Sequence, residues 1–93
     1  MRAILVTFNI KDKNIRPKLL ESIKSYSSWA KVNENTWIIL TSKNPSKLRD
    51  ELRDGLENKL TILTIEITNQ GWGTYAISKE VTDWMKKNLK QVN

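Results

Sequence analysis

The chain has 93 residues, of which 39% are hydrophobic and 28% charged, so it is long enough for one compact core and too short for two. It contains no cysteine and no histidine, which excludes disulfides, thiolate metal sites, thiol nucleophiles and the commonest general base. The net charge is +6, and Lys and Arg outnumber Asp and Glu by seven to two in residues 1–33 and by four to two in residues 70–93, whereas residues 34–69 hold five basic and six acidic residues. Basic ends favour anionic partners, although surplus lysine that only solvates the surface gives the same count.

The apolar runs are too short for a membrane protein. The N-terminal run at residues 3–6 is shorter than the core of a signal peptide, and no stretch approaches the roughly 20 residues that span a bilayer. Because nothing points to an oxidising compartment either, we expect a cytoplasmic protein without a membrane partner.

The first half of the chain predicts a strand, a helix and a hairpin. Residues 2–10 place apolar side chains on both faces of an extended segment, which is typical of a strand buried on both sides. Pro17 begins a helical repeat of apolar residues that continues to about Ser27. Residues 29–32 and 36–41 are strand-like runs joined by a short polar segment, so we expect two antiparallel strands after the helix.

The second half predicts a helix, a strand and a last helix. Asn44 before Pro45 is typical of a helix start, and Gly55 and Asn58 close the segment that follows. Residues 59–68 alternate as a strand. After a loop that contains two glycines, Ser78 can cap a final helix.

This order predicts an α+β, ferredoxin-like βαββαβ domain, with an antiparallel sheet and two helices on one face. We expect a single domain over residues 1–93, with its core in about 1–68 and a C-terminal loop and helix in 69–93. The other face of the sheet needs a cover, which either the tail or a second chain provides. We expect a homodimer in which the tail assists.

Four short motifs are spread over nearly the whole chain. They are Phe8-Asn9-Ile10, Ser25-Tyr26, Trp29-Ala30-Lys31-Val32 through Thr36-Trp37, and Gly71-Trp72-Gly73-Thr74-Tyr75. These motifs resemble those of two related families, the small subunit of the CRISPR spacer-integration complex and the short bacterial proteins labelled SinR-like. The resemblance implies a ferredoxin-like homodimer, and in the integration subunit a carboxylate from each protomer, at the end of the first strand, that is proposed to hold a divalent metal.

The chain departs from this family at the position of the carboxylate. Asn9 stands there, and an amide cannot supply the anionic charge by which Mg²⁺ is normally held. Asp12 follows three residues later in a lysine-rich turn, and we interpret it as a turn residue. The acidic residues of the second helix interleave with arginines, as in ordinary surface pairing. Catalysis is therefore the weaker hypothesis, and we predict no metal and no cofactor.

The candidate binding residues lie in two segments. Lys11, Lys13, Arg16 and Lys18 follow the first strand, where basic side chains can contact phosphate, although a connecting loop also needs solvating groups. The family position Asn9 and the aromatic residues of the glycine-containing loop complete the predicted ligand-binding set, Asn9, Lys11, Lys13, Arg16, Lys18, Trp72 and Tyr75. Trp72 either packs against the tail or a partner chain, which we favour, or stacks on a base.

Three function classes remain open. The first is a non-catalytic, homodimeric binding protein for phosphate-bearing ligands, with nucleic acid favoured. The second is a protein of phage or mobile-element type that sequesters a nucleotide or cyclic nucleotide between protomers. The third is a protein-protein inhibitor, and a metal-dependent nuclease is a further alternative.

Overall fold

The computed structural model describes residues 1–89 and contains the predicted helices and strands in the predicted order. A short 3₁₀ turn at Lys13–Ile15 precedes the first helix. The bounds are β1 (Arg2–Ile10), α1 (Arg16–Lys24), β2 (Ser28–Asn33), β3 (Thr36–Thr41), α2 (Pro45–Arg53), β4 (Leu60–Glu66) and α3 (Lys79–Asn88). The predicted C-terminal segment 69–93 runs past the last described residue, so its part at 90–93 lies outside the described residues.

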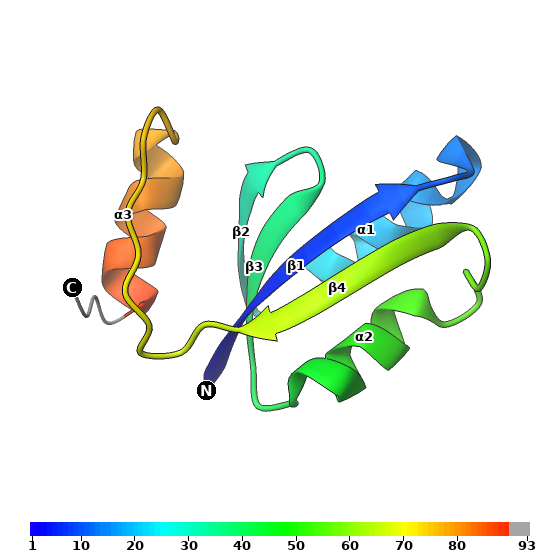
Figure 1. Cartoon of the computed structure of the whole chain (residues 1–93), viewed down its shortest axis with the longest axis horizontal. Coiled ribbons are helices and arrows are strands. Elements are labelled where there is room, and N and C mark those ends of the chain that lie inside the picture. The colour runs from blue at the N-terminus through cyan, green and yellow to red at the C-terminus, as the bar shows by residue number, and fades with distance from the viewer. Residues whose placement is uncertain (90–93) are drawn as a thin grey trace.

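The four strands form one antiparallel sheet in the order β2-β3-β1-β4. β1 lies in the middle, where Leu5 pairs with Ile38 of β3 on one side and with Ile65 of β4 on the other. Figure 1 shows α1 and α2 together on one side of the sheet and α3 apart from them, beside β2. The α+β class and the antiparallel sheet are confirmed, and the arrangement is compatible with a ferredoxin-like fold.

Local chemistry explains where α2 and α3 begin. The Asn44 side chain accepts a hydrogen bond from the Lys47 N–H (2.8 Å), and Pro45 occupies the first helical position, where no N–H is needed. Ser78 accepts from the Val81 N–H in the same way (3.2 Å). These caps satisfy N–H groups that have no partner inside the helix, so both starts were predictable from the sequence.

The main core lies between the sheet and the two helices α1 and α2. β1 contributes alternate side chains from Ile4 to Ile10, as expected for one face of a strand. The opposing helices contribute Leu19 and Ile23 from α1 and Leu48 and Leu52 from α2, all at most 1% exposed. Burial of this face on both helices is the main source of stability.

α3 covers part of the opposite face of the sheet. Val81 and Met85 of α3 are buried against Ala30 of β2 and Ile38 of β3. The tail therefore provides part of the cover that we expected for this face. No helix within residues 1–89 is long and apolar enough to cross a membrane.

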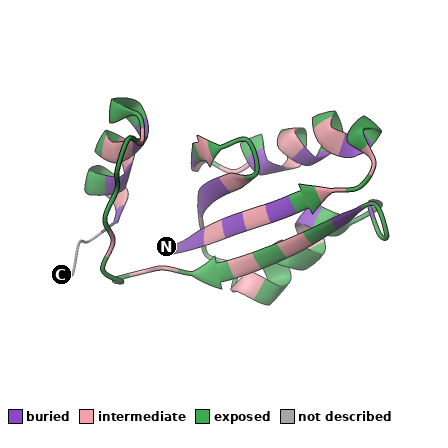
Figure 2. Cartoon of the chain, turned by 45° about the horizontal axis from the view of Figure 1, so that its top comes forward, coloured by how far each residue is buried: buried purple, intermediate pink, exposed green. Residues whose placement is uncertain are grey.

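The β4 side of this face stays uncovered. Figure 2 shows β1 alternating between buried and half-buried residues, whereas β4 is largely exposed or half-buried. Leu63 and Ile65 are 54% and 46% exposed, and they pair across the strands with Thr7 and with Leu5, which is half-buried at the border of the α3 cluster. We call these four residues the open strip.

Candidate ligand-binding site

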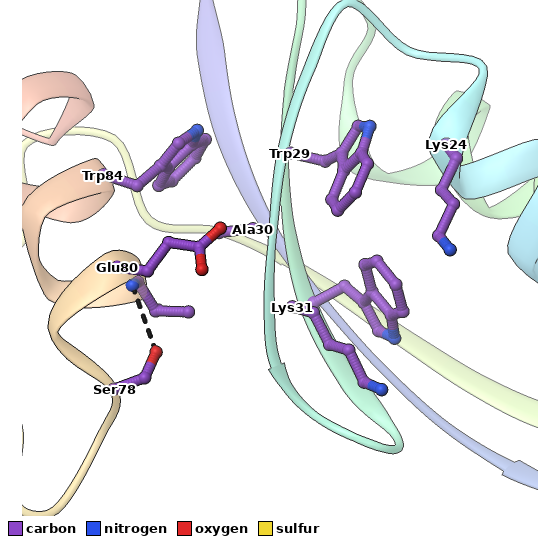
Figure 3. A pocket seen from close by; sticks show the side chains of 9 residues that line it. Lys24, Trp29, Ala30, Lys31, Ser78, Glu80 and Trp84 are labelled. Atoms are coloured by element: carbon purple, nitrogen blue, oxygen red, sulfur yellow. Dashed lines mark hydrogen bonds between the residues drawn. The ribbon is translucent and has the colours of Figure 1, made fainter.

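A pocket of about 390 Å³ lies beside the edge strand β2. Figure 3 shows Trp84 and Glu80 of α3 on one side of the strand, and Trp29, Lys31 and Lys24 on the other. Trp37 of β3 also lines the pocket. Three tryptophans and two lysines thus meet at one place, which we call the tryptophan pocket.

Trp29 and Trp37 form the aromatic wall of this pocket. Their ring centroids are 5.4 Å apart and the planes are tilted by 53°, a favourable arrangement for two aromatic rings. Trp29 is half-buried, whereas Trp37 is only 1% exposed. The buried Nε1 of Trp37 has no hydrogen-bond partner within residues 1–89, which is unusual for a buried donor.

Lys24 lies over this aromatic pair. Its Nζ is 5.7 Å from the centroid of Trp29 and 5.8 Å from that of Trp37, within the range of a cation–π interaction. The same ammonium group makes no ion pair with any described residue. Its charge is therefore available to an anionic ligand at the aromatic wall.

The α3 wall is tied to the strand by one hydrogen bond. Trp84 Nε1 donates to the hydroxyl of Ser28, the first residue of β2, over 3.1 Å. Glu80 is exposed and makes no ion pair within the described part of the chain. The pocket consequently has a positive side at α1 and an acidic residue at α3.

Arg16, one of the predicted phosphate ligands, is held at the tip of the β2–β3 hairpin. Its guanidinium donates to the Asn35 side chain (3.2 Å) and to the Glu34 carboxylate (3.1 Å), and it lies 5.8 Å from the centroid of Phe8. Lys31 donates to the same carboxylate (3.0 Å), and this hydrogen bond lowers the pKa of Glu34 below its usual value. These contacts hold the Arg16 guanidinium at the hairpin tip and not together with the other predicted basic residues.

Lys11 and Lys13 lie between β1 and α1, and Lys18 lies in the first turn of α1. The Lys11 N–H donates to the Lys59 carbonyl (2.8 Å), which adds Lys59 to this group. Gly55 has a φ of 77°, a backbone conformation that favours glycine, and Lys18 Nζ lies 2.7 Å from the point that a Cβ at this position would occupy. We call Lys11, Lys13, Lys18 and Lys59 the lysine end.

Asn9 lies near the lysine end on the uncovered face. It is exposed, and it pairs across the strands with Thr61. Together with Thr7 and Leu63 these residues line a shallow hollow of about 270 Å³. Asn9 therefore continues the open strip toward Lys11.

The two aromatic candidates of the glycine-containing loop have different environments. Trp72 is half-buried and packs against the α3 cluster, the outcome that the packing interpretation favours. Tyr75 is 95% exposed. Left-handed backbone in this loop occurs at Asn69 and Ala76, both with a φ of 59°, and a side chain at Gly73 would meet open space. Steric demand alone does not explain Gly73.

Several acidic side chains make structural contacts. Asp12 accepts from the Asn14 N–H (3.0 Å), as expected for a turn residue. Asp50 pairs with Arg49 and Arg53. No group of three or more acidic residues that could hold a metal ion occurs within residues 1–89.

Glu51 of α2 makes the most buried of these contacts. It accepts from the Tyr26 hydroxyl (2.7 Å) and from Lys43, whose hydrogen bond is the main reason that the pKa of Glu51 is lowered. Burial and this carboxylate raise the pKa of Tyr26. These contacts join α2 to the end of α1 and stabilise the main core rather than a site.

Comparison with protein-family models, curated proteins and solved structures found no match for this chain. Sequence reasoning missed the tryptophan pocket, since its members come from four elements. One signal was present: Trp29 and Lys31 are two residues apart on a strand and so share a face. No signal in the sequence places Lys24 or Trp84 beside them.

Proposed function

We propose that the protein is a non-catalytic, homodimeric binding protein for phosphate-bearing ligands, that nucleic acid is its ligand, and that its fold is ferredoxin-like. The observation that carries the proposal is the lysine end. Lys11, Lys13, Lys18 and Lys59 make no ion pair within the described residues, whereas most other basic side chains of the sheet and of α2 are paired. Unpaired ammonium groups at one end give a local positive potential that attracts phosphates.

The neighbouring acids limit how many phosphates this end can bind. Asp54 and Glu57 belong to the same α2–β4 connection as Lys59. Asp12 lies between two of the lysines, although its carboxylate is engaged with a backbone N–H. We therefore expect contacts with a few phosphates and a moderate dependence of affinity on salt.

The non-catalytic part of the proposal rests on the side chains themselves. Asn9 stands where the resembled family has a metal-binding carboxylate, and the carboxylate of Asp12 is occupied as a turn cap. Binding through lysines needs neither group, because electrostatic attraction and released counterions supply the affinity.

Changing Lys11 and Lys13 to glutamine together should weaken binding to a long DNA or RNA duplex. Each lost phosphate contact removes about 0.9 from the slope of log K against log salt, so the slope should fall by roughly 1.8 if both lysines contact phosphate. The measurement is fluorescence anisotropy of a labelled duplex from low to moderate salt.

The matched control changes Lys86 and Lys87 of α3, which are also exposed and unpaired. Equal affinities and slopes for wild type and the Lys11/Lys13 variant would refute the proposal.

The homodimer is proposed to form through the open strip. A second copy would cover Leu63 and Ile65, which otherwise expose apolar surface to water. Placing a charge there by Leu63→Glu should dissociate the dimer, because a carboxylate is costly to bury without a partner. Light scattering at micromolar concentration should give twice the 10.8 kDa chain mass for wild type and the single chain mass for the variant.

Tyr75→Glu is the matched control for this prediction. It adds the same charge at a large, fully exposed side chain outside the open strip, and the dimer should persist. A wild-type protein of 10.8 kDa at micromolar concentration would remove the dimer from the proposal.

A further inference from the structure

We propose that the tryptophan pocket binds a nucleoside phosphate, with its base against Trp29 and its phosphate at Lys24. This inference deepens the proposed function, on which its ligand class rests, and assigns a second, base-recognising site at the end of α1, whereas Lys18 of the lysine end lies near the start of that helix. The ligand chemistry is the same for a free nucleotide and for one nucleotide unit of a single strand.

The shape of the wall fits the flat face of a base. Trp29 is half-buried and so keeps part of its ring accessible. The ring of Trp37 packs against it with a centroid distance of 5.4 Å. A ring that is fixed by a buried neighbour is a ready stacking platform, since little rotamer freedom remains to be lost on binding. On the other side of the strand, Trp84 is fixed by its bond to Ser28.

The charges fit a ligand that is aromatic at one end and anionic at the other. Lys24 holds an ammonium group within 6 Å of both rings of the wall and has no carboxylate partner among the described residues. Lys31 lies 6.0 Å from the centroid of Trp37 but is neutralised by Glu34, so Lys24 is the stronger candidate for the phosphate. A phosphate at Lys24 gains a charge-assisted hydrogen bond beside an apolar wall.

The opposite charge of Glu80 orients the ligand. Its carboxylate extends toward the strand from the α3 side in Figure 3. It repels phosphate from that side and so favours binding with the phosphate at Lys24. A purine has a larger face than a pyrimidine for stacking on Trp29, so AMP is preferred over UMP.

The size of the pocket sets the size of the ligand. A volume of about 390 Å³ lies at the lower end of the range for small-molecule sites, roughly 300 to 1,000 Å³. One nucleotide fits such a space, whereas a base-paired duplex presents no free base to stack. The site is accordingly specific for a free nucleotide or an unpaired strand.

The test is a titration followed by tryptophan fluorescence, with AMP, UMP, inorganic phosphate and an oligoadenylate as probes. Stacking on a base is worth about 1 to 3 kcal/mol, or roughly five- to 150-fold in affinity. AMP should quench the fluorescence saturably, phosphate alone should not, and UMP should bind more weakly.

Trp29→Leu should weaken the affinity for AMP by about tenfold or more. Lys24→Gln should weaken it too, while an unchanged far-UV circular dichroism spectrum of the free variant shows that the fold persists.

Two matched comparisons separate this inference from the proposed function. Lys47→Gln removes an equally exposed lysine of α2 without an ion pair and should leave the affinity for AMP unchanged. The Lys11/Lys13 glutamine variant should lose duplex binding yet keep the response to AMP. Saturable quenching by AMP identifies a free nucleotide as a ligand, and quenching by oligoadenylate alone identifies a single strand.

The inference is wrong if neither AMP nor oligoadenylate quenches saturably, or if both variants, Trp29→Leu and Lys24→Gln, respond as wild type does. In that case the Lys11/Lys13 variant would still be expected to lose salt-dependent duplex binding. Failure of this inference is therefore distinguishable from failure of the proposed function.

Discussion

Replacing Trp37 by alanine is expected to lower the free energy of unfolding by about 3 to 5 kcal/mol, the range for a large aromatic side chain lost from a core. Trp37 is 1% exposed on β3, a central strand of the sheet, and it packs against both the main core and the ring of Trp29. Truncation would leave a cavity that strands on either side of β3 prevent from closing. Urea denaturation followed by circular dichroism measures the effect.

Trp37→Phe is the control that separates the effect of lost side-chain volume from the effect of the lost indole N–H. It keeps most of the ring and removes an N–H that has no partner within the described residues, so no hydrogen bond is lost. We expect less than half the destabilisation of the alanine variant. Equal losses for the two variants would show that Nε1 makes a stabilising contact and that the packing argument is wrong.

Replacing Trp72 by alanine should cost about 2 to 3 kcal/mol, below the full range for a buried tryptophan because the side chain is half-buried. Trp72 packs on the cluster that α3 forms with the sheet, so the loss should loosen α3 before the main core unfolds. Hydrogen exchange should show faster exchange of the α3 amides, and the thermal midpoint should fall.

The paired control for this prediction is Tyr75→Ala in the same loop. Tyr75 is 95% exposed, and its loss should change stability by no more than about 0.5 kcal/mol. If Trp72→Ala leaves the thermal midpoint unchanged and weakens ligand binding instead, Trp72 is a stacking residue and the packing interpretation fails.

The helices and strands were predictable because their signals are local. Asn44 and Pro45 start α2 through a side-chain cap and a missing N–H, and Ser78 starts α3 in the same manner. Apolar side chains point to both faces of β1 along residues 2–10, so both faces need to be covered by other groups. The α+β class followed from the order of these elements.

The candidate site was predicted only where its residues are neighbours in the chain. Lys11, Lys13 and Lys18 form a group because eight consecutive residues contain them. Arg16 belongs to the same segment, yet its contacts with Glu34 and Asn35 depend on where the hairpin tip lies. Lys59 joins the group through β1–β4 pairing, over a separation that no local pattern encodes.

By itself, the sequence determined the elements, the basic character of the chain and the need to cover both sides of β1, since hydrogen-bonding caps and hydrophobic periodicity act within a few residues. Only the tertiary structure decided which side chains share a surface. The packing of α3 against β2 brings Trp84 and Glu80 into the same pocket as Trp29, on the other side of the strand, and the end of α1 brings Lys24 over the Trp29 ring. These contacts follow from the burial of apolar surface between distant segments. Because the hydrophobic effect is non-directional, only the packing of the whole chain decides which segments meet.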